Sequence, residues 1–145
     1  WLSENLPFNP NPKKLCWGDS RIGNVLFENF QVKSLLDWEM ATIGDPLCDL
    51  AWGLTTDDVS SYGLNIEKLP GSISNEEAIK FWEIKTGYSA DNFFYYRILC
   101  LFKFSVIMIR VAKKLIHNEI MPLDSDFHVN NHVSNYLRQE FNEKN

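Results

Sequence analysis

The chain has 145 residues, of which 45% are hydrophobic and 14% aromatic. This composition is typical of a globular protein and excludes a disordered chain. A formal net charge of -5 argues against a nucleic-acid partner, which requires a basic face. Lys103 and Arg110 interrupt the only long apolar stretch, so we expect no membrane-spanning helix.

The beginning of the chain predicts a helix end, a linker and a hairpin. Residues 1–6 are typical of the last turn of a helix, and the prolines of residues 7–12 exclude helix there. Residues 24–27 and 32–36 are two short apolar runs joined by the turn-like residues 28–31. This pattern predicts an antiparallel β-hairpin.

The next segment predicts a loop, a helix and a second loop. Residues 40–44 are expected to form the first loop. Asp45 and Pro46 are expected to open the helix, because a carboxylate and a proline both suit the first turn. Its core face is predicted from helical spacing to consist of Leu47, Leu50, Ala51 and Leu54. Residues 55–74 contain Asp, Gly and Pro and predict a long loop.

Three more helices are predicted in the remainder of the chain. Ser74, followed by acidic residues, starts a helix that stops at Gly87. Asp91 is expected to cap a longer helix that reaches His117. The apolar residues of that helix cover most of its circumference, which is typical of a buried helix. The last helix is predicted for residues 127–141.

Two carboxylates and one amide stand out near the hairpin. Asn24 would open its first strand and Asp37 would follow its second, so antiparallel pairing would place both at one end. Asp19 lies on the preceding loop. Mg²⁺ needs oxygen ligands and takes only a few of them from protein. An amide and a carboxylate suit such a site, and Asp19 would then receive or orient a hydroxyl proton.

The sequence of this region resembles a known family. The motifs are W-G-D-x4-N-V-L-F, beginning at Trp17, and L-L-D-W-E-M-A-x-x-G-D-P-x-x-D-L-A, beginning at Leu35. Their order and spacing are similar to the catalytic loop and the metal-binding aspartate of protein-kinase-like phosphotransferases. In detail they resemble the aminoglycoside phosphotransferase family, and within it the subgroup associated with acyl-CoA dehydrogenases. The resemblance covers roughly residues 15–52.

The resemblance implies a role for each motif residue. Asp19 would be the catalytic base or the group that orients the substrate hydroxyl. Asn24 and Asp37 would bind Mg²⁺ and, through the ion, the phosphates of ATP. Arg21 would neutralise charge near the transferred phosphoryl group. Asp49 would support the catalytic loop by accepting backbone hydrogen bonds.

Some positions depart from the family pattern. Trp17 stands where most members have histidine, so any hydrogen bond of that histidine must be replaced or lost, and we expect a supporting role for Trp17. Trp38 and Glu39 stand where protein kinases carry the Phe and Gly of the D-F-G motif. Glu39 could reach a second metal ion or a substrate group.

The resemblance implies an α+β, mainly α fold: the C-terminal lobe of a protein-kinase-like fold. A small β-hairpin would carry the catalytic loop and pack on a helical bundle. Residues 1–145 would form this catalytic and substrate-binding lobe. An N-terminal nucleotide-binding lobe would be a partner absent from the chain, because no Gly-rich pattern precedes Asp19.

The long helix carries one further pattern. Four of its basic residues fall on one stripe, because steps of four and seven residues nearly close whole helical turns: Lys103, Arg110, Lys113 and Lys114. A solvated face is one interpretation of this stripe, and a strip that faces a phosphate or coenzyme A is the other.

The activity implied by the resemblance is ATP- and Mg²⁺-dependent transfer of the γ-phosphoryl group to a hydroxyl of a small molecule. A hydroxyacyl-CoA or a related metabolite is the candidate substrate, and this chain alone is expected to be inactive. A non-catalytic, pseudokinase-type binding or interaction module is the alternative, and metal-dependent nucleotide binding distinguishes the two. A third alternative is a truncated gene product that folds but has no function. Three distant cysteines without C-x-x-C spacing indicate free thiols, and hence the cytoplasm or an organelle matrix.

Overall fold

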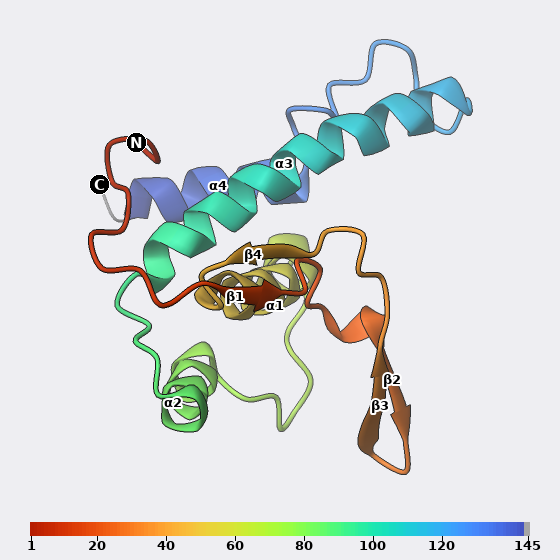
Figure 1. Ribbon diagram of the computed structural model, residues 1–145. Helices are drawn as coiled ribbons and strands as arrows, with labels where there is room; N and C mark the ends of the chain where they lie inside the picture. The colour runs from red at the N-terminus through yellow and green to blue at the C-terminus, as the bar shows by residue number, and fades with distance from the viewer. Residues whose placement is uncertain (144–145) are drawn as a thin grey trace.

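Four α-helices and four short β-strands make up the computed structural model, which describes residues 1–143 (Figure 1). The strands pair as two separate sheets, β1 with β4 and β2 with β3. Helices therefore form the body of the fold, and the predicted α+β, mainly α class is confirmed. Within residues 1–143, every helix is too short or too polar to cross a lipid bilayer.

The predicted hairpin is confirmed as strands β2, Val25–Glu28, and β3, Gln31–Leu35. Its loop is shorter than expected, because only Asn29 and Phe30 remain unpaired, with φ angles of 50° and 61°. Positive φ at both loop residues matches the twist of the two strands. The hairpin projects from the body, and most of its side chains are exposed (Figure 1).

A second ribbon was not predicted. Strand β1, Lys14–Cys16, pairs in antiparallel with β4, Thr42–Gly44. The prediction of a loop at residues 40–44 is therefore wrong for its last three residues. Strands of three residues carry too little periodicity to be detected, and this pairing joins segments that lie far apart in sequence.

The first residues form a turn in place of the predicted helix end. The Asn5 amide donates to the Trp1 carbonyl oxygen at 2.9 Å, and residues 1–6 contain no α-helix. The Trp1 ring contacts Phe94 and Phe141, with centroid distances of 5.8 and 5.9 Å. Aromatic packing on distant helices therefore positions this segment.

Helix α1 spans Leu47–Ser60. It starts where the sequence predicts, and Asp45 Oδ1 accepts a hydrogen bond from the first helical amide at 2.9 Å. The prediction of a loop from Thr55 is wrong for its first six residues. The helix continues because Thr55, Asp58 and Val59 are buried against other elements, which outweighs their modest helix propensity. A short 3-10 helix, η2, follows at Tyr62–Leu64.

Helix α2 spans Asn75–Thr86 and has the predicted ends. Ser74 and Glu77 form a capping box: Ser74 Oγ accepts from the Glu77 amide at 3.2 Å, and Glu77 Oε2 accepts from the Ser74 amide at 3.0 Å. Gly87 ends the helix with a φ of 71°. None of the residues of α2 is fully buried, so this helix packs on the body by one edge.

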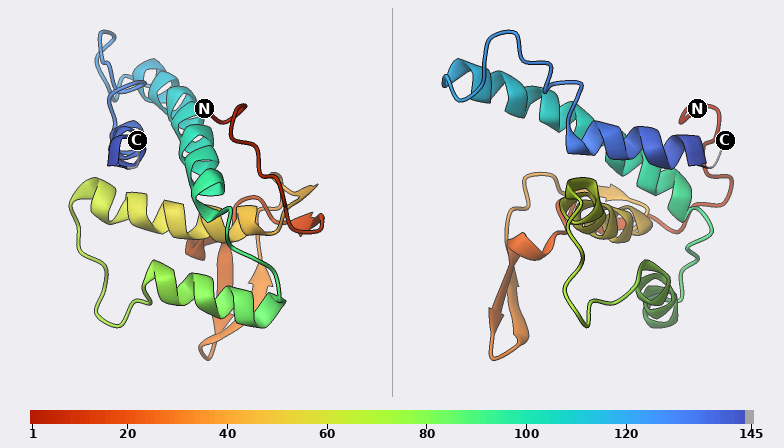
Figure 2. Two further views of the ribbon diagram at one scale, coloured as in Figure 1. Left: turned by 90° about the vertical axis from the view of Figure 1, so that its left-hand side faces the viewer. Right: turned by 180° about the vertical axis from the view of Figure 1, so that it is seen from behind.

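Helix α3 spans Phe93–His117, and α4, His132–Glu143, runs alongside it (Figure 2). The prediction that α3 is buried around most of its circumference is wrong, because Phe102 and Val106 are 52% and 46% exposed. Helices α1 and α4 pack against α3, and its second half projects beyond the body (Figure 1). One apolar face of α3 is therefore open.

The ends of these two helices also differ from the prediction. The residue that caps α3 is Asn92, not Asp91, and it makes no side-chain capping hydrogen bond. Helix α4 begins at His132, five residues later than predicted, because residues 121–131 form turns. Boundaries set by turns of this kind are not visible in apolar periodicity.

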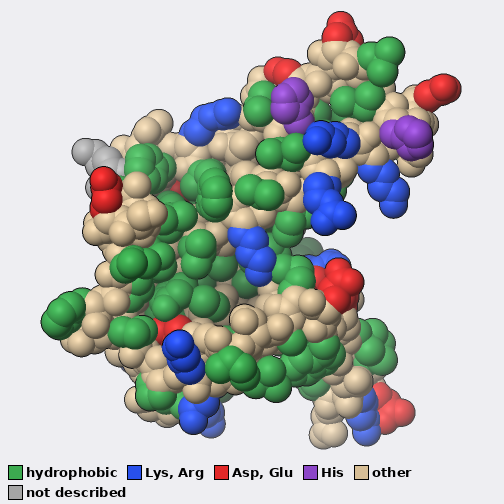
Figure 3. Space-filling model, turned by 45° about the horizontal axis from the view of Figure 1, so that its top comes forward, with side chains coloured by type: hydrophobic (Ala, Val, Ile, Leu, Met, Phe, Trp, Pro, Cys, Tyr) green, Lys and Arg blue, Asp and Glu red, His purple; other side chains and the backbone are tan. Residues whose placement is uncertain are grey.

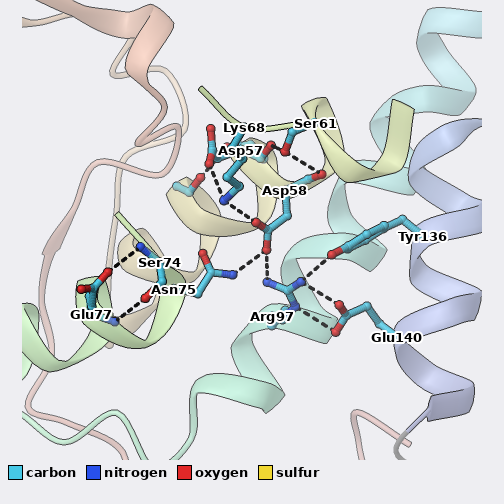
Figure 4. A network of polar contacts seen from close by, with 12 residues as sticks. Asp57, Asp58, Ser61, Lys68, Ser74, Asn75, Glu77, Arg97, Tyr136 and Glu140 are labelled. Carbon is cyan, nitrogen blue, oxygen red and sulfur yellow. Dashed lines mark hydrogen bonds and ion pairs between the residues drawn. The ribbon is translucent and has the colours of Figure 1, made fainter. Parts of the chain in front are cut away.

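A buried polar network joins three helices (Figure 4). Arg97 on α3 donates to Asp58 on α1 and to Glu140 on α4, each at 2.7 Å. Lys68 forms a second ion pair with Asp58 at 2.6 Å, and Asn75 Nδ2 donates to the same carboxylate at 2.7 Å. Burial alone would raise the pKa of Asp58, but hydrogen bonds from Lys68, Arg97 and Asn75 lower it below its ordinary value.

Candidate active site

Asp19 lies on the loop after β1, and three side chains hold its carboxylate. Trp52 Nε1 donates to Oδ1 at 2.7 Å. Asn24 Nδ2 and Arg21 Nε donate to Oδ2 at 2.6 and 3.1 Å. Burial alone would raise the pKa of Asp19, but these hydrogen bonds and the charge of Arg21 lower it. Asp19 is therefore an ionised carboxylate with a fixed orientation.

The backbone before Asp19 requires glycine. Gly18 has a φ of +87°, a conformation that L side chains rarely adopt. A Cβ atom there would lie 2.1 Å from the carbonyl oxygen of Met40, far inside van der Waals contact. The segment after β3 therefore packs directly against the loop that carries Asp19.

Asp49, in the first turn of α1, holds the same loop from the other side. Its Oδ2 atom accepts a hydrogen bond from the Trp17 amide at 2.7 Å, and its Oδ1 atom accepts one from the Gly18 amide at 2.8 Å. Ser20 Oγ donates to the Asp49 carbonyl oxygen at 2.6 Å. The two amides before Asp19 and the side chain after it are thus fixed to the start of α1.

Trp17 connects this loop to the end of the hairpin. Its indole N–H donates to the carbonyl oxygens of Leu36 at 2.8 Å and Asp37 at 3.2 Å. The Leu36 amide donates to the Asn24 carbonyl oxygen at 2.8 Å. Asp37 follows directly, with a φ of 59° that turns the chain away from β3. Asn24 and Asp37 are therefore brought together at the open end of the hairpin.

Four of the predicted site residues line one groove of about 1110 Å³: Asp19, Arg21, Asp37 and Glu39. Asn24 is buried and hydrogen-bonded to Asp19, and it does not line the groove. The structure thus brings Asp19, Arg21 and Asn24 into direct contact. In the described chain, the carboxylates of Asp37 and Glu39 make no hydrogen bond or ion pair, although both border the groove.

The oxygen donors here suit one hard cation. The side-chain nitrogen of Asn24 donates a hydrogen bond to Asp19. The side-chain oxygen of Asn24 accepts no hydrogen bond from any residue that the structure describes. The carboxylate of Asp37 is equally unpaired. Such donors fit Mg²⁺, which completes its coordination with water and phosphate. Residues 1–143 contain no cluster of three or more His, Cys, Asp or Glu side chains that could hold a metal ion.

Helix α3 forms a wall of the groove that sequence reasoning missed. The residues of this wall include Leu99, Phe102, Lys103, Val106, Ile107 and Arg110. Figure 3 shows a hollow beside the projecting part of the molecule, with Lys and Arg side chains at its edge. Neither Lys103 nor Arg110 has an ion-pair partner among residues 1–143. The basic stripe was visible in the sequence, but its position next to Asp19 was not.

Trp52 was missed as well, because the motifs assign it no role. It is buried, yet its indole N–H reaches Asp19, and its ring centroid lies 4.6 Å from Lys103 Nζ. A buried indole N–H needs a hydrogen-bond acceptor, and this requirement was the signal that could have identified Trp52.

Comparisons with known proteins agree with the motif resemblance. Residues 1–81 match the model of the phosphotransferase enzyme family, APH. Acyl-CoA dehydrogenase family member 11 from Pongo abelii is 38% identical over 91 residues, which are 57% of this chain and 12% of that protein. The protein of the same name from Rattus norvegicus is 31% identical over 118 residues, which are 74% of this chain and 15% of that protein.

A solved structure shares the fold. The crystal structure of a protein described as an aminoglycoside phosphotransferase, from Ralstonia eutropha, aligns with a TM-score of 0.68 and 19% identity. The alignment covers 97% of this chain and 44% of that chain. The chain thus spans less than half of its structural neighbour and 12% to 15% of these two relatives.

The family match includes both motifs and extends over more than half of the chain. The fold of the remaining helices agrees with it, since the structural alignment reaches almost the whole length. The resemblance inferred from the motifs is therefore confirmed, and the chain belongs to the phosphotransferase enzyme family.

Proposed function

We propose that this chain is the catalytic, C-terminal lobe of an ATP- and Mg²⁺-dependent small-molecule kinase. It transfers the γ-phosphoryl group to a hydroxyl of a substrate bound in the groove beside Asp19. The observation that supports this most is the fixed, ionised carboxylate of Asp19 at the edge of a groove that Arg21 and Asp37 also line. An N-terminal nucleotide-binding lobe is the partner that would enclose ATP.

In this reaction the substrate hydroxyl donates a hydrogen bond to Asp19. The hydroxyl oxygen forms a bond to the γ-phosphorus, the bond from that phosphorus to the β,γ-bridging oxygen breaks, and the hydroxyl proton passes to Asp19. A carboxylate with a lowered pKa is a weak base, so Asp19 orients the hydroxyl and takes the proton only as the new bond forms.

Asn24 and Asp37 are the residues that would hold Mg²⁺, which neutralises charge on the nucleotide phosphates when bound. Arg21, whose guanidinium is half exposed beside Asp19, would stabilise charge on the transferred group. Glu39 borders the same groove and could contact a second metal ion or the substrate. Asp49 holds the loop that carries Asp19, and Trp17 joins this loop to the end of the hairpin.

The groove supports a substrate with an apolar part and an anionic part. The α3 wall presents apolar side chains next to two cations, Lys103 and Arg110, that have no ion-pair partner within residues 1–143. A polycationic aminoglycoside would meet repulsion there, whereas a hydroxyacyl-CoA or a related metabolite would find both kinds of contact. The names of the relatives, acyl-CoA dehydrogenase family members, agree with this substrate class.

The test is Asp19→Asn in a protein that carries this chain together with a nucleotide-binding lobe. Phosphoryl transfer from ATP to a panel of hydroxyacyl-CoA esters should fall by several orders of magnitude, while Mg²⁺-dependent ATP binding stays nearly unchanged. Retained transfer would remove Asp19 from its role. Absence of Mg²⁺-dependent nucleotide binding in the unchanged protein would favour a non-catalytic binding module instead.

A further inference from the structure

Trp52 lines the groove beside Asp19. Its indole N–H donates to Asp19 Oδ1 at 2.7 Å, and its side chain is almost fully buried. Trp52 is on α1, one turn after Asp49, which accepts hydrogen bonds from the amides of Trp17 and Gly18. One face of α1 therefore holds both the backbone of the loop and the side chain of Asp19.

A count of hydrogen bonds distinguishes the two oxygens of Asp19. An ionised carboxylate offers about four lone-pair sites, two on each oxygen. Asn24 and Arg21 occupy both sites of Oδ2, whereas Trp52 occupies one site of Oδ1. The remaining site is on Oδ1, the oxygen that Trp52 holds.

Lys103 acts on the same indole. Its Nζ atom lies over the Trp52 ring, 4.6 Å from the centroid. A cation over an aromatic face draws electron density toward itself, which polarises the N–H bond at the ring edge. Lys103 also lines the groove. The Trp52 ring therefore connects a charge bound in the groove, through Lys103, with the hydrogen bond to Asp19.

We propose that Trp52 is a positioning residue for phosphoryl transfer: its N–H fixes Oδ1 of Asp19 and leaves the second lone pair of that oxygen for the substrate hydroxyl. This inference rests on the proposed function, in which Asp19 receives the hydroxyl. It goes beyond the family motifs, because Trp52 follows the last motif residue, Ala51, and no motif role falls on it.

Nuclear magnetic resonance on the chain as it stands tests the contact without any turnover. Asp19→Asn should shift the indole ¹H–¹⁵N resonance of Trp52, because the charged acceptor of its N–H is replaced by a neutral one. The indole resonance of Trp82, whose N–H makes no hydrogen bond among the described residues, should stay in place. A Trp52 resonance that Asp19→Asn leaves in place would overturn the inference.

Trp52→Phe then removes the N–H and keeps most of the ring. Trp82→Phe is the matched control, because it also removes an indole N–H but not one that contacts Asp19, and it should leave kcat unchanged. With a nucleotide-binding lobe present, Trp52→Phe should lower kcat about tenfold with little change in KM for ATP.

The outcomes separate the inference from the proposed function. An unchanged kcat in folded Trp52→Phe contradicts the positioning role of Trp52. Full phosphoryl transfer by Asp19→Asn contradicts the proposed function, even where that substitution shifts the resonance of Trp52.

Discussion

Asp58 on α1 and Arg97 on α3 form a buried ion pair, with Arg97 Nη1 donating to Asp58 Oδ2 at 2.7 Å. Asp58 is 1% exposed, so its charge is stabilised by protein groups and not by water. The pair joins the helix that holds the Asp19 loop to the helix that forms the wall of the groove. The relative position of the two sides of the groove depends on it.

Asp58→Asn should destabilise the fold by about 3 kcal/mol, because Arg97 and Lys68 both lose their buried counter-charge and Arg97 keeps only Glu140. The matched control is Asp57→Asn. Asp57 pairs with the same Lys68, but its side chain is 59% exposed, so its removal should cost less than about 1 kcal/mol. Urea unfolding of both variants measures the difference, and equal losses would contradict the role assigned to the buried pair.

The stability should also depend on pH through Asp58. Its pKa is lowered in the folded state, so below about pH 4 the unfolded chain binds more protons than the folded chain. The stabilisation is complete above the unfolded pKa and is lost as pH falls through the folded value. The gap in unfolding free energy between the parent and Asp58→Asn should therefore shrink from pH 7 to pH 3.5. A constant gap would show that Asp58 has an ordinary pKa.

Gly18→Ala should disrupt the loop that carries Asp19. The new Cβ would collide with the backbone of Met40, and the positive φ adds strain, so we expect a loss of at least about 3 kcal/mol. Gly71→Ala is a close control, because Gly71 has the same φ of +87° with no atom within 4 Å of the added Cβ. It should cost only about 1 to 2 kcal/mol. Similar losses in chemical denaturation of the two variants would refute the close approach at Met40.

Arg110→Met should weaken binding of an anionic, partly apolar substrate about tenfold, since it removes one charge-assisted contact and keeps the apolar stem. Lys113→Met is the control, because Lys113 is on the same helix and does not line the groove. Binding titrations with hydroxyacyl-CoA esters at low and high salt measure both variants. An equal effect of the two substitutions would indicate a diffuse surface charge and not a site on α3.

The parts that sequence reasoning predicted are those with local signals. The ends of α2 follow from Ser74, Glu77 and Gly87, which act within one helical turn. The hairpin follows from two apolar runs and the short turn between them. The start of α1 follows from Asp45 and Pro46, whose effects are also local.

The parts that were missed depend on contacts between distant residues. Helix α1 continues to Ser60 because Asp58 finds partners on α3 and in the segment before α2. The open face of α3 reflects how far α1 and α4 reach along it, which periodicity does not encode. Trp52 and Asp19 are 33 residues apart, so their hydrogen bond could not be read from spacing. The candidate site was thus predictable as motifs, but its groove and its support were not.

The central claim is that Asn24 and Asp37, at the open end of the hairpin beside Asp19, hold one magnesium ion. Mn²⁺, added with ADP in place of Mg²⁺, tests it directly through paramagnetic broadening of resonances in this chain. The side-chain amide of Asn24 and the backbone amide of Asp37 should broaden first, Asp37→Asn should abolish the effect, and Asp57→Asn should not. Broadening that spares Asn24, or that survives Asp37→Asn, would contradict the account.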